Sequence, residues 1–169
     1  MLRWIIAAGA AACLAGCSGE APVENQAETA AKLTPGQYQA DWKVTALRSV
    51  DKTTPATNLK PDATGTTTAC VTAEAIDPVL FAEDGDTCTI ANPYLRNGRL
   101  RMDLTCTSKG VPGEVRQSVA GTFTADGLEA EVGTTTYLSG NGDYSMSRTF
   151  TAMRLGECPP AAAEPTENK

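Results

Sequence analysis

Cysteine is the residue type of this chain best suited to chemistry, and its spacing decides which chemistry is available. The chain contains six cysteines and no histidine. Four of the cysteines lie far apart along the chain: Cys70, Cys88, Cys106 and Cys158. A tetrahedral zinc site usually draws its ligands from close pairs such as Cys-x2-Cys, whereas an even number of separated cysteines is typical of disulfides in an exported protein. We therefore predict disulfide bonds, and neither a metal nor any other cofactor.

The other residues offer little that resembles a catalytic centre. Nucleophilic catalysis by serine or cysteine usually needs a histidine base, which the chain lacks. The acidic run Glu83-Asp84-Gly85-Asp86 has neither the spaced acids nor the closing glutamate of an EF-hand, and it predicts a solvated loop. We therefore predict that the protein is not an enzyme. A hydrolase or transferase that uses paired carboxylates or a Ser-Lys dyad is the alternative.

The first residues of the chain are typical of a secretory signal peptide. One cation, Arg3, precedes the apolar and small residues 5–16, and polar sequence begins at Ser18. The apolar run is shorter than the roughly 20 residues that a membrane-spanning helix needs. We therefore predict that residues 1–16 are a signal peptide, which removes Cys13 from the mature chain.

The end of this segment, Leu14-Ala15-Gly16-Cys17, resembles the lipobox of bacterial lipoproteins. The resemblance implies that Cys17 receives a diacylglyceryl group, becomes the first residue of the mature chain and anchors it to a membrane through acyl chains such as palmitate. Ser18, in place of aspartate, implies the outer membrane of a Gram-negative bacterium, with the domain facing the periplasm. The alternative is an ordinary signal peptide cut nearby, which leaves Cys17 as a free thiol.

The charge of the chain limits its partners. The formal net charge is −6, and Arg3 is lost with the predicted signal peptide. A negative chain without a basic cluster repels nucleic acid and anionic lipid headgroups. We therefore expect no nucleic-acid partner, and contact with the membrane through the lipid anchor only.

Composition divides the mature chain into three parts. Residues 17–34 are polar and rich in Ala and Glu, which predicts a flexible linker after the lipidated N-terminus. Residues 159–169 (PPAAAEPTENK) predict a disordered tail. Between them, residues 35–158 form one β domain, long enough for a single core.

Apolar residues alternate with polar ones over most of this domain, which is the pattern of half-buried strands. We predict an all-β fold: a single antiparallel meander of roughly six to eight strands, curved or barrel-like. A two-layer sandwich is the alternative. One short helix is expected within residues 72–82, because Asp77-Pro78 is typical of a helix start. The residues expected on the inner face include Leu100, Met102, Leu104, Val115, Val119, Phe123, Leu128, Ala130, Val132, Tyr144, Met146 and Phe150.

The register of one hairpin predicts how the cysteines pair. A three-residue loop over residues 96–98 keeps the apolar residues on one face and sets Cys88 opposite Cys106. A two-residue turn formed by the last two of these residues would mix the faces. The first register predicts a Cys88–Cys106 disulfide, and by elimination Cys70 pairs with Cys158.

Two further connections are predicted from turn residues. Asp126-Gly127 suits a two-residue hairpin turn that sets Phe123 opposite Ala130. Residues 48–65 are polar and interrupted by proline, which predicts a mobile loop. A lid over an apolar opening is the alternative for this segment.

Several of these features together resemble an exported bacterial family labelled domain of unknown function 3617. The resemblance covers residues 35–158 and includes four cysteines in the family's order. It implies a small disulfide-bonded periplasmic domain and carries no activity. The Met-Pro segment common before the first cysteine of that family is missing here. The matching pieces are Pro35-Gly36-Gln37-Tyr38, Cys70-Val71-Thr72-Ala73-Glu74, Gly121-Thr122-Phe123 and Arg154-Leu155-Gly156-Glu157-Cys158.

These observations predict a lipid-anchored cell-envelope protein. Its β domain is expected to bind an apolar small molecule or an envelope partner protein.

Replacing the lipidated cysteine tests the predicted anchor. Cys17→Ser removes the thiol that would accept the lipid, so the chain should leave the membrane fraction or accumulate as an uncleaved precursor. Membrane fractionation and intact-mass spectrometry measure both results. A variant that fractionates like the wild type and carries the same added mass would contradict the lipidation of Cys17.

Overall fold

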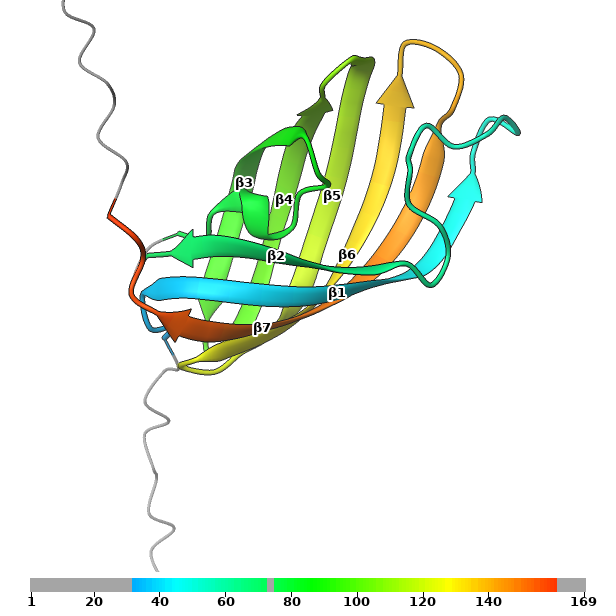
Figure 1. Ribbon diagram of the computed structural model, residues 1–169. Helices are drawn as coiled ribbons and strands as arrows, with labels where there is room; N and C mark the ends of the chain where they lie inside the picture. The colour runs from blue at the N-terminus through cyan, green and yellow to red at the C-terminus, as the bar shows by residue number, and fades with distance from the viewer. Residues whose placement is uncertain (1–31, 73–74, 161–169) are drawn as a thin grey trace, which may run out of the picture.

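The computed structural model describes residues 32–72 and 75–160. Seven strands form one antiparallel sheet in the order β2-β1-β7-β6-β5-β4-β3, which curls into a half-barrel (Figure 1). The predicted all-β meander is confirmed, and the sandwich alternative is wrong. The strands are β1 (Gly36–Ser49), β2 (Thr64–Val71), β3 (Asp86–Arg96), β4 (Arg99–Ser108), β5 (Val111–Phe123), β6 (Gly127–Leu138) and β7 (Tyr144–Gly156).

The folded domain begins slightly before the predicted boundary. Leu33, which we placed in the linker, is only 7% exposed and packs into the core, and the Thr34 amide donates to the Ala125 carbonyl at 2.7 Å. The predicted signal peptide, Cys17, and most of the predicted linker and tail lie outside the described residues. Within residues 32–72 and 75–160, no helix is long and apolar enough to cross a membrane.

One face of each central strand lines the concave side of the sheet. Every second residue of β4 is buried there, and none of these is more than 2% exposed. The same alternation continues through β5, β6 and β7, so the predicted inner face is confirmed. Its buried apolar residues on these four strands are Leu100, Met102, Leu104, Cys106, Val115, Val119, Phe123, Leu128, Ala130, Val132, Tyr144, Met146, Phe150 and Ala152.

The β3–β4 hairpin has the predicted register at its cysteines but a different turn. Cys88 lies opposite Cys106, as expected. The tip, however, is a two-residue turn in which Asn97 and Gly98 have φ of 52° and 68°, as in a type I′ turn. The extra residue of β3 sits in a bulge at Asn92, whose φ is 51°. Asparagine tolerates this conformation and the following Pro93 has no N–H to donate, so the bulge forms there and the predicted three-residue loop is wrong.

The β5–β6 hairpin turns one residue earlier than predicted. Phe123 lies opposite Leu128 and not Ala130. The turn spans residues 124–127 and is closed by a 2.8 Å hydrogen bond from the Thr124 amide to the Gly127 carbonyl. The carbonyl of Ala125, within this turn, accepts a hydrogen bond from the Tyr38 hydroxyl at 3.1 Å. This bond holds the turn in its observed position. The pairing moves by two residues, so the same side chains still face inward.

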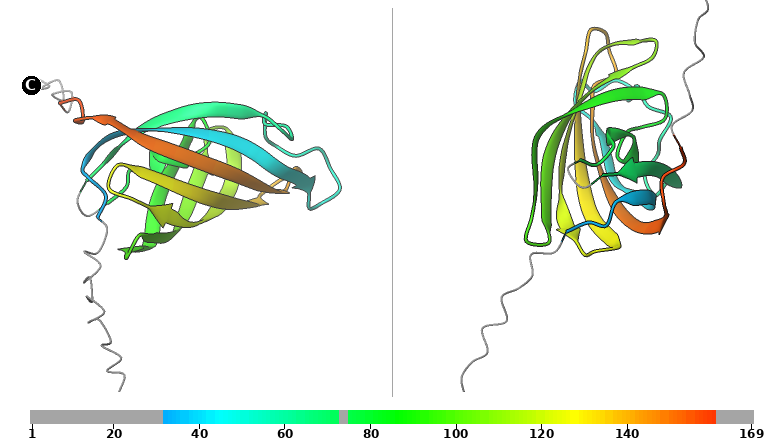
Figure 2. Two further views of the ribbon diagram at one scale, coloured as in Figure 1. Left: turned by 90° about the horizontal axis from the view of Figure 1, so that it is seen from below. Right: turned by 90° about the vertical axis from the view of Figure 1, so that its left-hand side faces the viewer.

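A short segment fills the opening between the edge strands β2 and β3 (Figure 2). It contains η1 (Pro78–Leu80), a single 3-10 turn that begins as predicted: the Asp77 carboxylate accepts a hydrogen bond from the Val79 amide at 3.0 Å. The Thr67 hydroxyl donates to the Leu80 carbonyl at 2.8 Å and holds the turn against β2. Ile76, Leu80 and Phe81 are at most 2% exposed and face the sheet, as expected.

Both predicted disulfides are present. Cys88–Cys106 joins neighbouring strands of one hairpin, and Cys70–Cys158 joins β2 to the residue just beyond the end of β7. Their sequence separations are 18 and 88 residues. The longer bridge therefore fastens an edge strand to the C-terminal end of the domain.

The two bridges should differ in what they contribute to stability. In the chain-entropy view, the cost of losing a disulfide grows with the length of the loop it closes, so Cys70→Ala/Cys158→Ala should lower the free energy of unfolding by about 1–2 kcal/mol more than Cys88→Ala/Cys106→Ala. Urea denaturation of the two double variants measures the difference. A larger loss from the β3–β4 pair would contradict this ranking.

Candidate functional site

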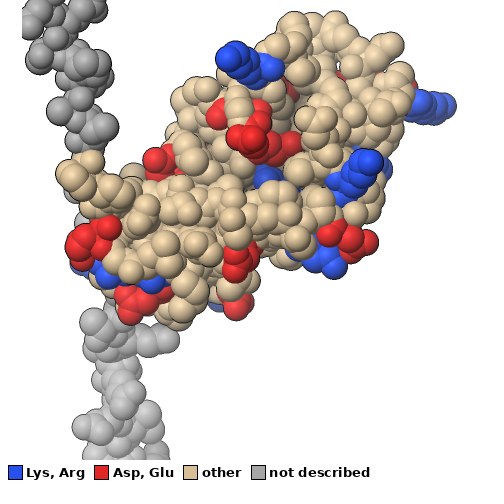
Figure 3. Space-filling model, viewed as in Figure 1, with Lys and Arg blue, Asp and Glu red and all other residues tan. Residues whose placement is uncertain are grey.

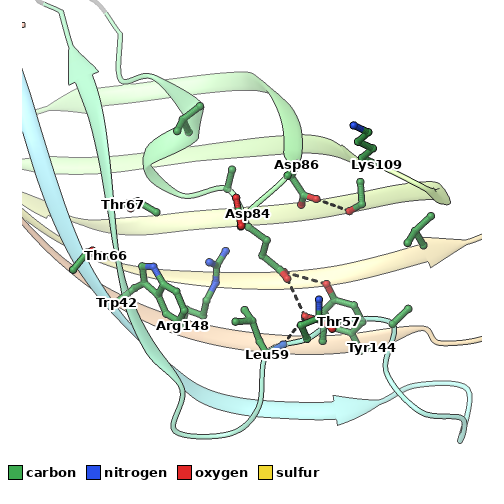
Figure 4. A pocket seen from close by; sticks show the side chains of 18 residues that line it. Trp42, Thr57, Leu59, Thr66, Thr67, Asp84, Asp86, Lys109, Tyr144 and Arg148 are labelled. Carbon is green, nitrogen blue, oxygen red and sulfur yellow. Dashed lines mark hydrogen bonds between the residues drawn. The ribbon is translucent and has the colours of Figure 1, made fainter. Parts of the chain in front are cut away.

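A pocket of about 660 Å³ opens on the concave side of the half-barrel. Its walls come from β1, β2 and β7, loop 50–63, the segment that carries η1, and the β4–β5 turn. Figure 4 shows the guanidinium of Arg148 beside the ring of Trp42 within this pocket. Acidic side chains gather on the same face of the molecule (Figure 3), and three of them line the pocket: Glu83, Asp84 and Asp86.

Arg148 lies on the inner face of β7, where period-two alternation places it between Met146 and Phe150. The residue is only 1% exposed. Its Nη2 donates a hydrogen bond to the Phe81 carbonyl at 2.7 Å, an acceptor that a longer helix after η1 would have used itself. Its Cζ lies 5.1 Å from the centre of the Phe150 ring and 5.9 Å from that of Trp42. The cation therefore lies over two aromatic rings, a favourable arrangement for a desolvated guanidinium.

Gln117 on β5 is the nearest buried amide to this cation. With its oxygen oriented toward Arg148, the amide accepts from Nη2 at 3.1 Å and its nitrogen donates to the Phe81 carbonyl at 3.3 Å. Gln117 is 2% exposed. One end of the guanidinium is therefore held by two neutral groups, and neither of them balances its charge.

Glu83 is the partly buried carboxylate of the pocket. Its Oε1 accepts a hydrogen bond from the Tyr144 hydroxyl at 3.0 Å, and its Oε2 accepts one from the Thr57 hydroxyl at 3.1 Å. Burial raises the pKa of Glu83, and the nearby Arg148 opposes this shift. Burial and the Glu83 charge both raise the pKa of Tyr144. The carboxylate thus faces hydroxyl donors, and its interaction with Arg148 is one of longer range.

Arg148 has no ion-pair partner within 4 Å in the part of the chain that the structure describes. Burial lowers the pKa of Arg148, and Glu83 partly offsets that effect. Its Nε is buried and makes no hydrogen bond to any described residue, and the same is true of Trp42 Nε1 and Thr134 Oγ1. Buried donors are almost always satisfied in folded proteins, so unused donors at a pocket indicate a site for an acceptor.

Loop 50–63, the central part of the segment for which we predicted a mobile loop, forms one wall of the pocket. The Asp51 carboxylate accepts hydrogen bonds from the amides of Thr53, Gly142 and Asp143, at 2.9, 2.7 and 3.1 Å. These bonds tie the loop to the β6–β7 connection. The loop is therefore held beside the pocket.

Cys88 and Cys106 lie close to an acidic side chain but do not form a metal site. Asp86, Cys88 and Cys106 have ligand atoms within 4.8 Å of one another, but both sulfurs are joined in a disulfide and neither is a free thiolate. Asp86 instead accepts a hydrogen bond from the Ser108 hydroxyl at 2.5 Å. The group is therefore structural.

The sequence analysis missed the residues that the pocket brings together. Arg148 was passed over, although the alternation of its neighbours placed it on the inner face. Glu83 was assigned to a solvated acidic loop, and only its contacts with Tyr144 and Thr57 show that it turns inward. Trp42 follows the alternation of β1, but nothing in the sequence around it indicates that it lines a pocket.

Glu83 and Asp51 should give opposite pH dependences of stability. Burial raises the pKa of Glu83, so its contribution to stability is present at low pH and is lost as the pH rises through the folded-state pKa. Glu83→Gln should therefore gain stability relative to the wild type as the pH rises above the ordinary glutamate pKa of about 4. Hydrogen bonds from Thr53 lower the pKa of Asp51, so its contribution is present above the unfolded value and is lost on acidification.

Urea denaturation from neutral pH down to about pH 2 tests both directions, with Asp51→Asn as the matched variant. Asp51→Asn should lose stability at neutral pH and approach the wild type in acid. Curves for Glu83→Gln that run parallel to the wild type at every pH would contradict the burial of this carboxylate.

Comparison with known proteins gives one family. Residues 33–158 match the family described as "Protein of unknown function (DUF3617)". No curated protein and no solved structure matches the chain. The match includes every strand and both disulfides of the fold. The chain therefore belongs to the DUF3617 family.

Proposed function

We propose that this chain is a lipid-anchored cell-envelope protein that binds a small molecule in the pocket of its half-barrel, and that it is not an enzyme. The lipobox-like residues 14–17 support an anchor at Cys17, and Ser18 supports the outer membrane. The two disulfides support an oxidising compartment such as the periplasm.

The pocket itself carries the proposal. Its volume of about 660 Å³ lies in the range that small-molecule sites usually occupy. Its lining combines apolar side chains, such as Trp42 and Leu59, with the buried Arg148. This lining favours an amphipathic ligand over the wholly apolar one that the sequence suggested.

A hydrolase is the second candidate, because Glu83 and Asp86 line the same pocket and Glu83 has a raised pKa, as general acids often do. However, each carboxylate already accepts hydroxyl hydrogen bonds, from Tyr144 and Thr57 in one case and from Ser108 in the other. These bonds favour a structural role for the two acids, and binding is the better account.

Native mass spectrometry of the full chain purified from its envelope tests the proposal. The wild type should carry a small molecule that is released on denaturation. Val79→Trp adds bulk at a pocket residue that is 51% exposed, and it should abolish the bound mass. Leu155→Trp adds equal bulk at a 58% exposed site outside the pocket lining, and it should retain the mass.

Two results would contradict small-molecule binding. One is a wild-type chain without any bound mass, which would favour the envelope partner protein. The other is equal retention of the mass in both tryptophan variants.

A further inference from the structure

We infer that the ligand of this pocket is a monocarboxylic acid with an apolar body, and that the Nε of Arg148 and the indole N–H of Trp42 bind its carboxylate. This inference rests on the proposed function and specifies the chemistry of the ligand. It depends on three features of the pocket: unused donors, an unbalanced charge and the arrangement of the lining.

The two donors belong to side chains that both line the pocket. Arg148 Nε and Trp42 Nε1 are buried and donate to no described residue, and both side chains line the pocket. The guanidinium carbon is 5.9 Å from the centre of the Trp42 ring, so the side chains are direct neighbours (Figure 4). A buried donor without an acceptor costs free energy, and the two oxygens of a ligand carboxylate could serve as the missing acceptors.

The charge of Arg148 calls for an anion. A buried cation is costly unless a counter-charge and hydrogen bonds accompany it. The neighbouring Glu83 supplies a counter-charge only at longer range, since both of its oxygens face the hydroxyls of Tyr144 and Thr57. A carboxylate is one of the anionic groups whose acceptor geometry matches the planar donors of a guanidinium.

The rest of the lining limits the ligand to one negative charge. Among the described residues, the charged side chains that line the pocket are Glu83, Asp84 and Asp86 and the two cations Lys109 and Arg148. Three carboxylates would repel a phosphate dianion or a dicarboxylate.

The apolar lining accounts for the other half of the ligand. Trp42, Leu59, Ala56 and Val79 line the pocket, and Leu59 and Trp42 also pack against the small core cluster around Val44. These side chains would cover a short hydrocarbon chain, whose burial is favourable. The ligand class is therefore an organic acid with one carboxylate and an apolar tail.

Tryptophan fluorescence reports binding at this position directly. The sequence contains two tryptophans, Trp4 and Trp42, and Trp4 lies in the predicted signal peptide, so the mature chain should emit from the pocket residue alone. We expect octanoate to change this emission and to bind at least about ten-fold more tightly than octanamide, which has the same length and no charge. Octylamine and inorganic phosphate should leave the emission unchanged.

Conservative variants test the two donors separately. Arg148→Lys keeps a positive charge but removes the Nε donor, and it should weaken octanoate binding about ten- to a hundred-fold. Arg101→Lys makes the same change at an exposed site on β4 and should bind like the parent chain. Trp42→Phe keeps an aromatic ring without the N–H, and calorimetry should show several-fold weaker binding even if Arg148→Lys does not fold.

Three results would overturn the inference: equal affinity for octanoate and octanamide, binding of octylamine in preference to octanoate, or unchanged octanoate affinity in both Arg148→Lys and Trp42→Phe. Failure of octanoate to bind a chain that still carries a native small molecule would also overturn it, and the proposed function would stand. A wild-type chain that carries no native small molecule would instead contradict the proposed function on which this inference rests.

Discussion

A single antiparallel sheet that curls without closing determines the rest of this structure. Among the described strands, the edges β2 and β3 do not pair with each other, so the concave apolar face needs another cover. The segment that carries η1 provides it: Ile76, Leu80 and Phe81 pack inside the curve. This cover is short, and the space that it leaves beside loop 50–63 is the pocket.

Strand β7 links the fold to the pocket. It pairs with β1 on one side and β6 on the other. Just beyond its last residue, Cys158 forms the disulfide to Cys70. Its inward residues include the core side chains Met146 and Phe150 and, between them, Arg148. A strand that is paired on both sides therefore positions the buried cation, which suits a site that depends on fixed geometry.

The polar groups of the pocket show a cost in stability. Arg148 is buried, and no described residue places a counter-charge directly beside it. Glu83 is held by two hydroxyls in a setting that raises its pKa. Apolar side chains in these places would give the half-barrel a larger free energy of unfolding. A stability cost of this kind is common at binding sites, and it is the physical reason for treating the pocket as functional.

Much of the fold was determined by the sequence itself. Period-two alternation depends only on neighbouring residues, so it predicted the strands, the buried face and the register that brings Cys88 opposite Cys106. The same alternation did not predict the turns correctly. The bulge forms at Asn92, and the Tyr38 hydroxyl holds the β5–β6 turn one residue earlier than predicted. Only the tertiary structure decided the pocket. Trp42, Glu83 and Arg148 come from distant parts of the chain, and the local pattern of each is that of an ordinary strand or loop residue. Their meeting depends on the curvature of the sheet and on the segment that fills its opening.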